Sequence, residues 1–477
     1  MTVVGGKNNN RTQFAMKYLC ILVVIGFTLS GCLVGPKYKR PESNSMSAYM
    51  AADSLGKDST GLVAWTEIYK DPELTKLIRN VLDSNLDLLN AVSRVEEARA
   101  QYGFTKANLY PGFGYNLYGG VNNLGSNAIQ AGAGIDNQVY QGFATMNWEI
   151  DLFGKLRHQK RSAWARFLAE QNNAQAVRVS LIAETATFYF ILRDLDNRLE
   201  ILKKTVESRT ASLNLISERY NKGYVSELDE LQARQQLAQA EALVPNLERQ
   251  IIAAQNALRL LTGQAPGNIV RGYDNYSQQL PAEIPAGIPA TLLQRRPDII
   301  AAEELLVSQT EEIGVAVALR FPTLSLTGFL GVASKSLSTI VDPSSLALGI
   351  SGGLFGPLFE FGKNKRRVEV QKTRAAQFSY QYQKTVLNAF SEVDNSLAAV
   401  RTYKVEYDAK HRELDAAAKA FTLTQARYSE GYSNYLELLN QQDNLLSAQI
   451  GESITQSQSN IAVVGLFKAL GGGWNAK

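Results

Sequence analysis

The chain has 477 residues, of which 45% are hydrophobic and 20% are charged. This length and apolar fraction are enough for a large core, so disorder throughout and a collagen-like repeat are excluded. The 49 Lys and Arg face 45 Asp and Glu, and Lys7, Arg11 and Lys17 lie in a segment without acids, so the rest of the chain is nearly neutral. Nucleic acid is therefore not expected as a partner.

The few cysteines and histidines exclude most metal sites. The chain contains only Cys20, Cys32, His158 and His411, and no pair of them has CxxC, HExxH or zinc-finger spacing. Thiolate and imidazole ligands for a metal are thus almost absent. We expect no metal or other cofactor apart from a covalent lipid.

Residues 1–31 are predicted to be a signal peptide, with a possible true start at Met16. Lys17 precedes the apolar run 18–29, which is too short to span a bilayer. The run ends in Leu29-Ser30-Gly31-Cys32, which resembles the lipobox of bacterial lipoproteins. Cys32 is therefore expected to carry diacylglycerol and an N-acyl chain; the alternative is an incidental cysteine near a cleavage site.

The rest of the chain contains an internal repeat. An offset of 208 positions aligns 153–155 with 361–363 and 223–224 with 431–432 with identical residues, and an offset of 211 aligns earlier positions. One offset held over a long stretch is typical of a duplicated unit. We therefore predict an extended segment, a first repeat, a linker, a second repeat and a short tail, which comprise residues 32–72, 73–263, 264–296, 297–471 and 472–477.

Each repeat is predicted to contain a long helical hairpin. From Lys155 to Lys222 the sequence has no Gly or Pro, and apolar residues recur every three or four positions. At 1.5 Å per residue this helix is roughly 100 Å long. The turn 221–223 reverses the chain, and a second apolar stripe runs back to Gly263. We expect antiparallel hairpins with a narrow apolar seam and tips near 223 and 431; the polar faces suit either a solvated surface or a water-filled lumen.

Two stretches alternate with a period of two and predict one β-hairpin per repeat, within 110–152 and 320–360. The clearest example is 139–152, in which apolar and polar residues alternate. Strands of about 10 residues have the length of tilted outer-membrane strands, although a soluble sandwich would show the same pattern. Four strands cannot close a barrel, and lipid does not tolerate open edges. If the strands span a membrane, several chains must share one barrel.

Enzyme motifs give no support for catalysis. Residues 349–353 fit the pattern GxSxG, but they lie in an alternating stretch that is not followed by a helix. The sequence contains no Walker A or GxGxxG motif. The chain is therefore not expected to be an enzyme.

Several motifs carry a family resemblance. Residues 34–42 (VGPKYKRPE) are similar to the VGPxYxxPE opening of the TolC-like outer membrane factors, in the lipoprotein branch (NodT/OprM-like) that serves RND efflux pumps. Residues 65–78, 293–299 (LQRRPDI) and 469–474 (ALGGGW) resemble further motifs of that branch, in the same order. The resemblance covers the whole mature chain.

The resemblance implies a mainly α fold with a membrane β-barrel part. Three chains would form a trimeric α-barrel continued by a shared 12-stranded outer-membrane β-barrel. The implied function is a passive gated duct, anchored in outer-membrane lipid, that joins a periplasmic adaptor (membrane fusion) protein and an inner-membrane RND transporter. The alternatives are a type I secretion duct of the same fold and a non-conducting, lipid-anchored coiled-coil scaffold.

The resemblance also places the turns 219–226 and 427–434 at the periplasmic tip. The residues expected to contact the adaptor there are Tyr220, Gly223, Tyr224, Tyr428, Gly431 and Tyr432. The alternative is that the glycines and tyrosines only end and cap the helices.

Residues 435–443 align with the family segment YLxLLDAQR, whose Leu, Asp and Arg constrict the closed pore. Leu436 carries over directly, whereas Asn440 stands in place of Asp and Asp443 in place of Arg. Three copies of Asp443 would form an acidic ring that repels itself and binds cations, with added charge from Asp229 and Glu230; the alternative is a solvated acidic face. We expect sealing to depend on a Leu436 ring and hydrogen bonds more than on interchain ion pairs.

Overall fold

A computed structural model describes residues 33–41, 50, 64–122, 137–278, 280–281 and 293–472. The predicted signal peptide 1–31 and Cys32 lie outside the described residues. The chain forms two compact units, each assembled from separate stretches of sequence. The first comprises the described parts of Met1–Pro41, Val95–Glu170 and Ala302–Tyr382, and the second those of Glu42–Arg94, Gln171–Ala301 and Gln383–Lys477.

The helix bounds confirm the internal repeat. Helices α6 (Lys155–Asn221) and α10 (Lys363–Ser429) both have 67 residues and differ by 208 positions at each end. The same offset relates α7 (Glu227–Leu261) to α11 (Tyr435–Ala469), which have 35 residues each. An offset of 211 relates α4 (Leu86–Ala107) to α9 (Pro297–Ala318). Among the described helices, none is both long enough and apolar enough to cross a membrane.

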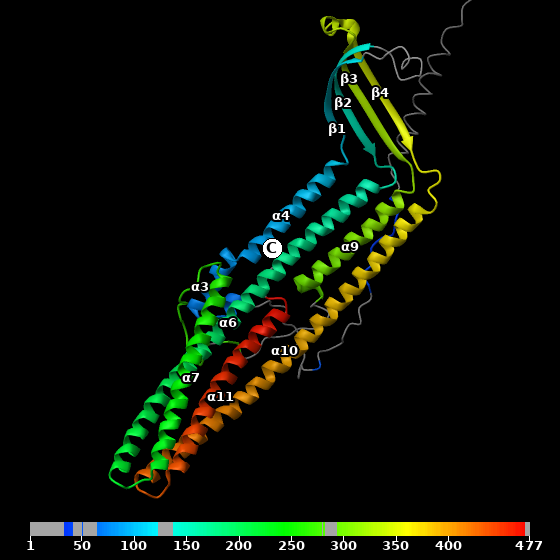
Figure 1. The fold of residues 1–477 in the computed structure, drawn as a ribbon. Helices are drawn as coiled ribbons and strands as arrows, with labels where there is room; N and C mark the ends of the chain where they lie inside the picture. The colour runs from blue at the N-terminus through cyan, green and yellow to red at the C-terminus, as the bar shows by residue number, and fades with distance from the viewer. Residues whose placement is uncertain are drawn as a thin grey trace, which may run out of the picture. The chain divides into compact units, whose positions relative to one another are not determined.

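The predicted strands form one antiparallel sheet in the first unit, seen in Figure 1. Its strands are β1 (Gly112–Asn122), β2 (Asn137–Ile150), β3 (Thr323–Ser334) and β4 (Leu346–Phe355), in the order β1-β2-β3-β4. Two short 3-10 turns, η1 (Leu337–Thr339) and η2 (Pro343–Ser345), lie between β3 and β4. The hairpins of the two repeats are joined because β2 pairs with β3, from Tyr140 opposite Ser334 to Ile150 opposite Leu324.

The alternating apolar residues of the outer strands face away from the rest of the chain. Phe113, Tyr115 and Leu117 on β1 and Leu348 and Ile350 on β4 are all strongly exposed. Within the described strands, β1 and β4 are the two edges of the sheet and each pairs on one side only. Among the described residues, nothing covers this apolar face or pairs with the two edges.

The GxSxG sequence lies within strand β4. The Ser351 hydroxyl is hydrogen-bonded to the Thr327 hydroxyl at 2.7 Å across the β3–β4 pair. His158 contacts Glu311 and the carbonyl of Val34, so it is not a partner of Ser351. The strained strand-to-helix turn of a hydrolase nucleophile is absent at Ser351.

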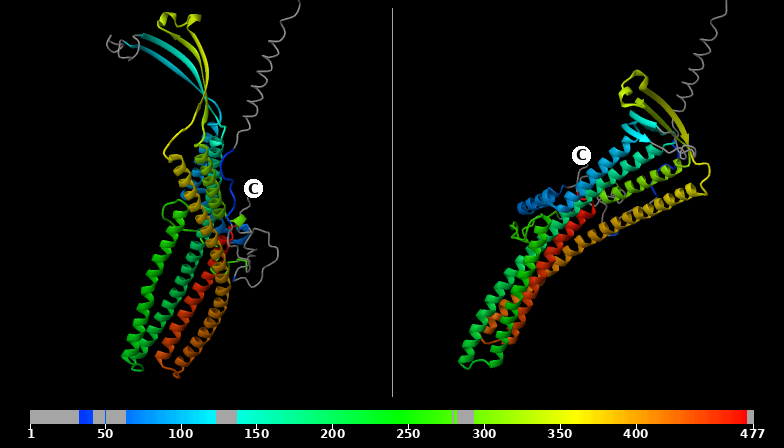
Figure 2. Two further views of the ribbon diagram at one scale, coloured as in Figure 1. Left: turned by 90° about the vertical axis from the view of Figure 1, so that its right-hand side faces the viewer. Right: turned by 45° about the horizontal axis from the view of Figure 1, so that its top comes forward.

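In the second unit, the parts of α6, α7, α10 and α11 nearest the two turns lie side by side, with both turns at one end (Figures 1 and 2). The predicted narrow seam is wrong for the middle of α6. Tyr189, Phe190 and Leu192 are buried on several sides of this helix, whereas Glu184, which has the three-or-four-residue spacing of the predicted seam, is exposed. The physical reason is that α3 (Pro72–Ser84), α7 and α11 all contribute to the hydrophobic cluster around this stretch.

A buried carboxylate holds the linker against α6. Asp71 begins α3 and accepts hydrogen bonds from the backbone N–H groups of Glu73 and Leu74. Its other oxygen accepts from the Tyr189 hydroxyl and from the N–H of Tyr273, both at 2.8 Å. Because Asp71 is fully buried, these bonds replace the water that its charge would otherwise require.

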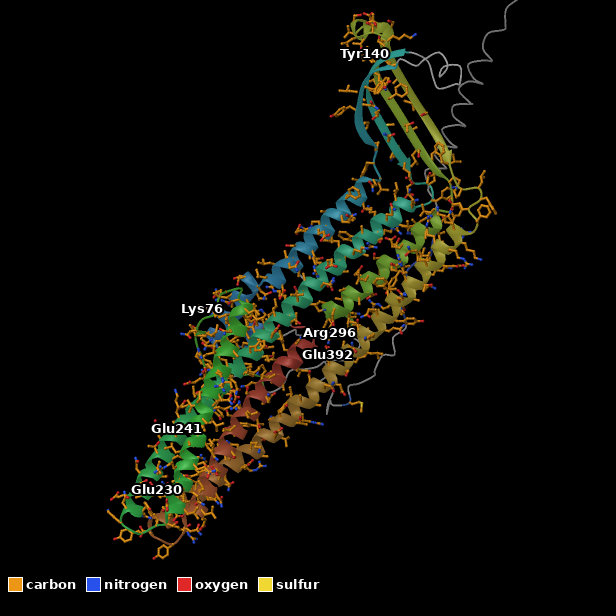
Figure 3. All side chains as sticks on the ribbon, viewed as in Figure 1. Lys76, Tyr140, Glu230, Glu241, Arg296 and Glu392 are labelled. Carbon is orange, nitrogen blue, oxygen red and sulfur yellow. The ribbon has the colours of Figure 1, made fainter. Side chains whose placement is uncertain are left out.

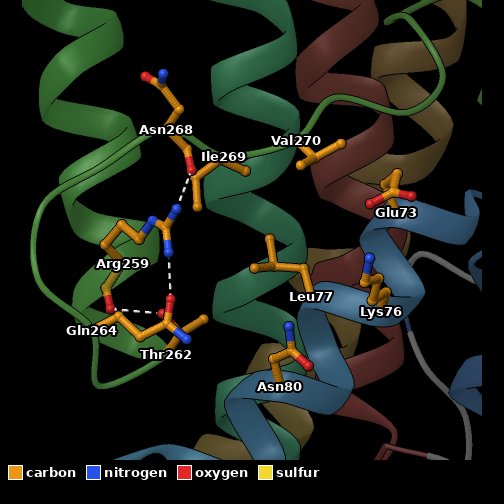
Figure 4. A pocket seen from close by; sticks show the side chains of 10 residues that line it. All are labelled: Glu73, Lys76, Leu77, Asn80, Arg259, Thr262, Gln264, Asn268, Ile269 and Val270. Atoms are coloured by element: carbon orange, nitrogen blue, oxygen red, sulfur yellow. Dashed lines mark hydrogen bonds between the residues drawn. The ribbon is translucent and has the colours of Figure 1, made fainter.

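Two arginines fasten the ends of the linker. The guanidinium of Arg259, at the end of α7, donates to the Gln264 side chain and to the carbonyl of Asn268, at one wall of a polar pocket shown in Figure 4. Arg296, just before α9, donates to Asp298, and its guanidinium lies 2.7 Å from the carboxylate of Glu392 (Figure 3). Burial lowers the pKa of Arg296, but these two carboxylates raise it by more, so it stays charged.

We expect Asp71→Asn to lower the free energy of unfolding by about 2 kcal/mol, because the amide nitrogen cannot accept the bonds made by Tyr189 and Tyr273. Thermal unfolding of the purified protein measures the change. The matched control is Asp83→Asn, which removes an exposed carboxylate from the same helix and is expected to have little effect. Equal unfolding temperatures for the two variants would contradict the role given to Asp71.

Candidate functional site at the helical tips

The two turns between the long helices have the same backbone conformation. Gly223 and Gly431 have φ angles of 76° and 81°, in the left-handed region that glycine adopts without strain. The N–H of Tyr224 donates to the carbonyl of Arg219 at 2.9 Å, and that of Tyr432 to Arg427 at 2.8 Å. A Cβ at either glycine would meet no atom within 4 Å, so the backbone angle is what requires glycine here.

The helices that follow the turns are capped by side chains. Ser226 and Asp229 form a capping box at the start of α7, in which each side chain bonds the backbone N–H of the other. Asn434 accepts from the N–H of Glu437 at the start of α11. Asp229 therefore has a structural role at the tip, whatever charge it adds.

The predicted contact tyrosines divide into two groups. Tyr224 and Tyr432 are strongly exposed, and Tyr220 is 37% exposed. Tyr428 is only 7% exposed, with its ring 6.0 Å from that of Tyr435. For Tyr428 the prediction of an outer contact residue is thus wrong, because its ring packs inside the tip.

The inner tyrosines belong to a small core that joins the two helical hairpins. It consists of Ile216, Ala233, Tyr428, Tyr435 and Leu438. The guanidinium of Arg219 lies 5.2 Å from the centre of the Tyr428 ring, a cation–π contact. Burial, and then the neighbouring Tyr428, raise the pKa of Tyr435 to about 12, so its hydroxyl is neutral at physiological pH.

The structure brings the predicted gate residues of α11 onto one face. Leu436, Asn440 and Asp443 are separated by four and three positions, so they lie in a row along the helix. Leu436 and Asn440 are exposed, and Asp443 is half-buried. The side chains that this row exposes most are thus the apolar Leu436 and the amide of Asn440.

Arg209 on α6 is the partner of Asp443, and the sequence analysis did not identify it. Its guanidinium donates to the Asp443 carboxylate at 2.6 Å and to the carbonyl of Gln236 at 2.7 Å, and it is only 5% exposed. The prediction of a ring of free Asp443 carboxylates is therefore wrong, because this carboxylate is paired with an arginine of its own chain. The sequence does contain a sign that Arg209 is buried. It occupies one of the regularly spaced positions 202, 206, 209, 213 and 216, and the other four are apolar.

Glu230 is also engaged within its own chain. Its carboxylate accepts from the Ser217 hydroxyl at 2.9 Å and from Arg234 at 3.0 Å, and it lies near the tip in Figure 3. Together with the cap made by Asp229, this gives both of the predicted charged residues of the first turn a partner within the chain. Among the described residues, no group of His, Cys, Asp and Glu is arranged to hold a metal ion.

A concave surface lies beside the first turn. It is lined by Leu215, Glu218, Arg219, Lys222, Tyr224 and Val225. Glu218 and Lys222 form an ion pair at its rim, with 2.5 Å between carboxylate and ammonium. The first tip thus offers a mixed surface, in which three charged side chains stand beside two apolar ones and the ring of Tyr224.

Comparisons with known proteins agree on one family. The model of the outer membrane efflux protein family matches residues 77–264 and 288–472. The solvent efflux pump outer membrane protein SrpC of Pseudomonas putida is 32% identical over 96% of this chain and 99% of its own length. The outer membrane protein OprJ of Pseudomonas aeruginosa is 32% identical over 95% of both chains.

A solved structure shows the same fold. The open state of the Neisseria gonorrhoeae MtrE outer membrane channel superposes with a TM-score of 0.85 at 28% identity, and covers 93% of this chain and 98% of that one. The residues that the family model matches include all four strands, both long helical hairpins and both turns. This chain therefore belongs to the outer membrane efflux protein family, as an outer membrane component of an efflux system.

Proposed function

We propose that three copies of this chain form a passive duct in a tripartite RND-type efflux system. The four-stranded sheets of the three copies would close into one 12-stranded barrel, and the long helices would continue it as a tunnel through the periplasm. A periplasmic adaptor and an inner-membrane RND transporter would complete the system, and the transporter would supply the energy.

The sheet carries this proposal. Its outer residues are apolar and exposed, which suits lipid, but β1 and β4 each leave one row of backbone groups unpaired within the described chain. Unpaired backbone groups are too costly in a bilayer. Pairing β4 of one copy with β1 of the next satisfies both edges, and three copies of four strands give an even-numbered barrel.

The tips support docking of the adaptor. Tyr224 and Tyr432 are exposed at equivalent positions of the two repeats, and the concave surface beside Tyr224 combines apolar and charged side chains. Aromatic side chains on a rigid scaffold are the usual anchors of protein interfaces. Gly223 and Gly431 would act by shaping the turns, and Tyr428 by packing beneath them.

The row on α11 supports a gate at the same end. Three Leu436 side chains around an axis would narrow the tunnel with an apolar ring, and Asn440 would contribute hydrogen bonds one turn further along. Because Asp443 is paired with Arg209, its charge would contribute little to closure.

A lipid on Cys32 would reinforce the membrane attachment. The next residue, Leu33, lies against Gly154, and the N–H of Val34 donates to the carbonyl of Phe153 at 3.4 Å. These contacts follow shortly after the end of β2 at Ile150. The acyl chains would thus enter the bilayer near one end of the sheet.

Single-channel conductance of the purified mature protein in planar bilayers, with its oligomeric mass in the same detergent, tests the proposal. We expect a trimer that forms a channel with a small conductance or a low open probability. A folded monomer that never conducts would contradict the duct and favour a lipid-anchored scaffold.

For the gate, we expect Leu436→Ala to increase the open probability, because it removes the apolar ring. The matched control is Leu423→Ala, which shortens an exposed leucine of α10. Asn440→Ala is expected to cause a smaller increase. An unchanged conductance would remove that residue from the gate.

For the ion pair, we expect Arg209→Met to make the open channel more cation-selective, because three Asp443 carboxylates lose their counter-charges. Reversal potentials in a salt gradient measure the selectivity. The control Arg249→Met removes an exposed arginine from α7. The same change in both variants would show that net charge, and not the Asp443 carboxylate, is responsible.

For the lipid anchor, we expect Cys32→Ser to abolish incorporation of labelled palmitate. Cys20→Ser is the control, since Cys20 would leave with the signal peptide. Label retained in the Cys32→Ser protein would show that acylation, if any, occurs elsewhere.

A further inference from the structure

The two repeats meet within the first unit, where the helices near the sheet follow one another in the order α4, α6, α9 and α10 (Figure 1). The α6–α9 contact joins the first repeat to the second. Helices α4 and α10 are the outer members of this row, so each has one side that no other helix of the row covers. The contacts between neighbours include Tyr102 with Trp164, Arg166 with Glu312, and Gln309 with Gln371.

The two offsets relate the repeats down to the register of their strands. Adding 211 to the number of Gly112 and 208 to that of Asn147 converts this β1–β2 pair into Thr323–Phe355, which is the register observed between β3 and β4. A slip of one residue would move every side chain to the other face of the sheet. The same offsets relate α6 to α10 and α4 to α9 at both ends. Contacts can therefore be carried from one repeat to the other residue by residue.

The α6–α9 contact is closely packed and polar. His158, Ser162 and Arg166 lie one turn apart on the side of α6 that faces α9. The Ser162 hydroxyl lies 2.9 Å from the Ser308 hydroxyl, and Arg166 donates to the same hydroxyl at 3.1 Å. His158, Ser162 and Ser308 are each only 2% exposed. Helix α9 thus covers this side of α6 completely.

The equivalent positions of α10 and α4 are exposed. On α10 they are Arg366, Val370 and Arg374, and the counterpart of Ser308 on α4 is Glu97. Positions that a second helix covers in the α6–α9 contact are therefore uncovered on the outer sides of α10 and α4 in the described chain. The two outer sides are also complementary in charge, because the position of Arg166 keeps its arginine and that of Ser308 has gained a carboxylate.

A glycine in α4 supports the same arrangement. Gly103 lies within the helix, where glycine is unfavourable because it loses the most backbone freedom on folding. A Cβ at Gly103 would meet no atom within 4 Å, so no contact among the described residues requires glycine there. Its counterpart Gly314 is packed against His158, and a Cβ at Gly314 would lie 2.5 Å from the imidazole. The counterpart of His158 is Arg366, for which Gly103 would leave room.

The offsets also relate a stacked pair of rings to two exposed ones. The Phe153 ring, just before α6, stacks on Phe321, just after α9, with 4.7 Å between the ring centres. The counterparts are Phe361 and Tyr110, which are 90% and 63% exposed. Two rings that stack between the repeats thus have counterparts that the described chain leaves uncovered.

We infer that the outer side of α10 packs against the outer side of α4 of a second copy, in the register of the α6–α9 contact. Val370 meets Glu97 of the next copy, and Arg374 donates to the same carboxylate. Arg366 crosses Gly103 of the next copy, and the ring of Phe361 contacts its Tyr110. This inference rests on the proposed assembly of three copies, and it adds the residues and the register of the contact.

A second copy fits these helices better than lipid does. Lipid phosphate could bind Arg374, but it would repel Glu97. Each of the two outer sides instead supplies what the other lacks, as α9 does for α6 within the chain. Because α4 and α10 lie at opposite ends of the row, one such contact on each side of every copy leads to a closed ring.

Cysteine crosslinking tests the register. Because the Ser162 and Ser308 hydroxyls are 2.9 Å apart, Val370→Cys and Glu97→Cys place two thiols at disulfide distance across the interface. We expect mild oxidation of this double variant to give covalent trimers on a denaturing gel. The matched control combines Val370→Cys with Phe104→Cys, which moves one thiol about 10 Å along α4. The single variants measure any link that involves the native cysteines.

The mass of the same samples in detergent separates failure of this inference from failure of the proposed function. A trimer in which Glu97→Cys and Val370→Cys form no link would overturn the interface and leave the duct intact. Equal linking of the control pair would overturn the register. A protein that does not form trimers would instead contradict the proposed assembly.

Charge exchange tests the ion pair. An exposed ion pair contributes about threefold to an equilibrium constant, and the trimer contains three, so we expect Glu97→Arg or Arg374→Glu to weaken the trimer roughly 30-fold. A dilution series followed by native mass spectrometry measures the change. The double variant Glu97→Arg, Arg374→Glu is expected to restore the trimer. The matched control Glu96→Arg reverses a neighbouring exposed charge, and Arg374→Glu should not restore it. No restoration in the first pair, or equal restoration in the control, would overturn the ion pair.

Discussion

An open four-stranded sheet leaves backbone N–H and C=O groups without hydrogen-bond partners at its two edges, and this sheet also has an uncovered apolar face. Most of the architecture follows from this constraint. Strands β1 and β4 each need a partner for one row of N–H and C=O groups. Water can supply those partners, but lipid cannot. In the proposed outer-membrane duct, strands of further copies supply these partners. The long helices of the same copies would then form the wall of the tunnel.

The duplicated unit provides the geometry, and local substitutions provide the chemistry. The helices of the two repeats begin and end at equivalent positions, because their spacing, caps and turn glycines are preserved. The side chains between these fixed points differ. Asp443 is held by Arg209 in the wall of the tip, whereas its counterpart in the first repeat, Gln235, carries no charge.

The three carboxylates that were predicted to charge the gate all have partners within the chain. Asp229 caps a helix, Glu230 binds Ser217 and Arg234, and Asp443 binds Arg209. Each of these carboxylates could be read from the sequence as part of an acidic lumen. Pairing inside one chain leaves Leu436, the exposed apolar residue of the proposed gate, as the feature best able to narrow a pore. Such a gate would respond to packing more than to salt.

The sequence by itself determined the repeat, the long helices, the two hairpins and the glycine turns, because each depends on local spacing or on one backbone angle. It could not decide how widely α6 is buried around Tyr189, since that depends on α3, α7 and α11 arriving from distant parts of the chain. Nor could it pair Arg209 with Asp443, which are 234 positions apart, or place Tyr428 inside the tip. Spacing in the sequence shows which residues share one face of a helix or strand. Only the tertiary structure decides which side chains of other elements contact that face.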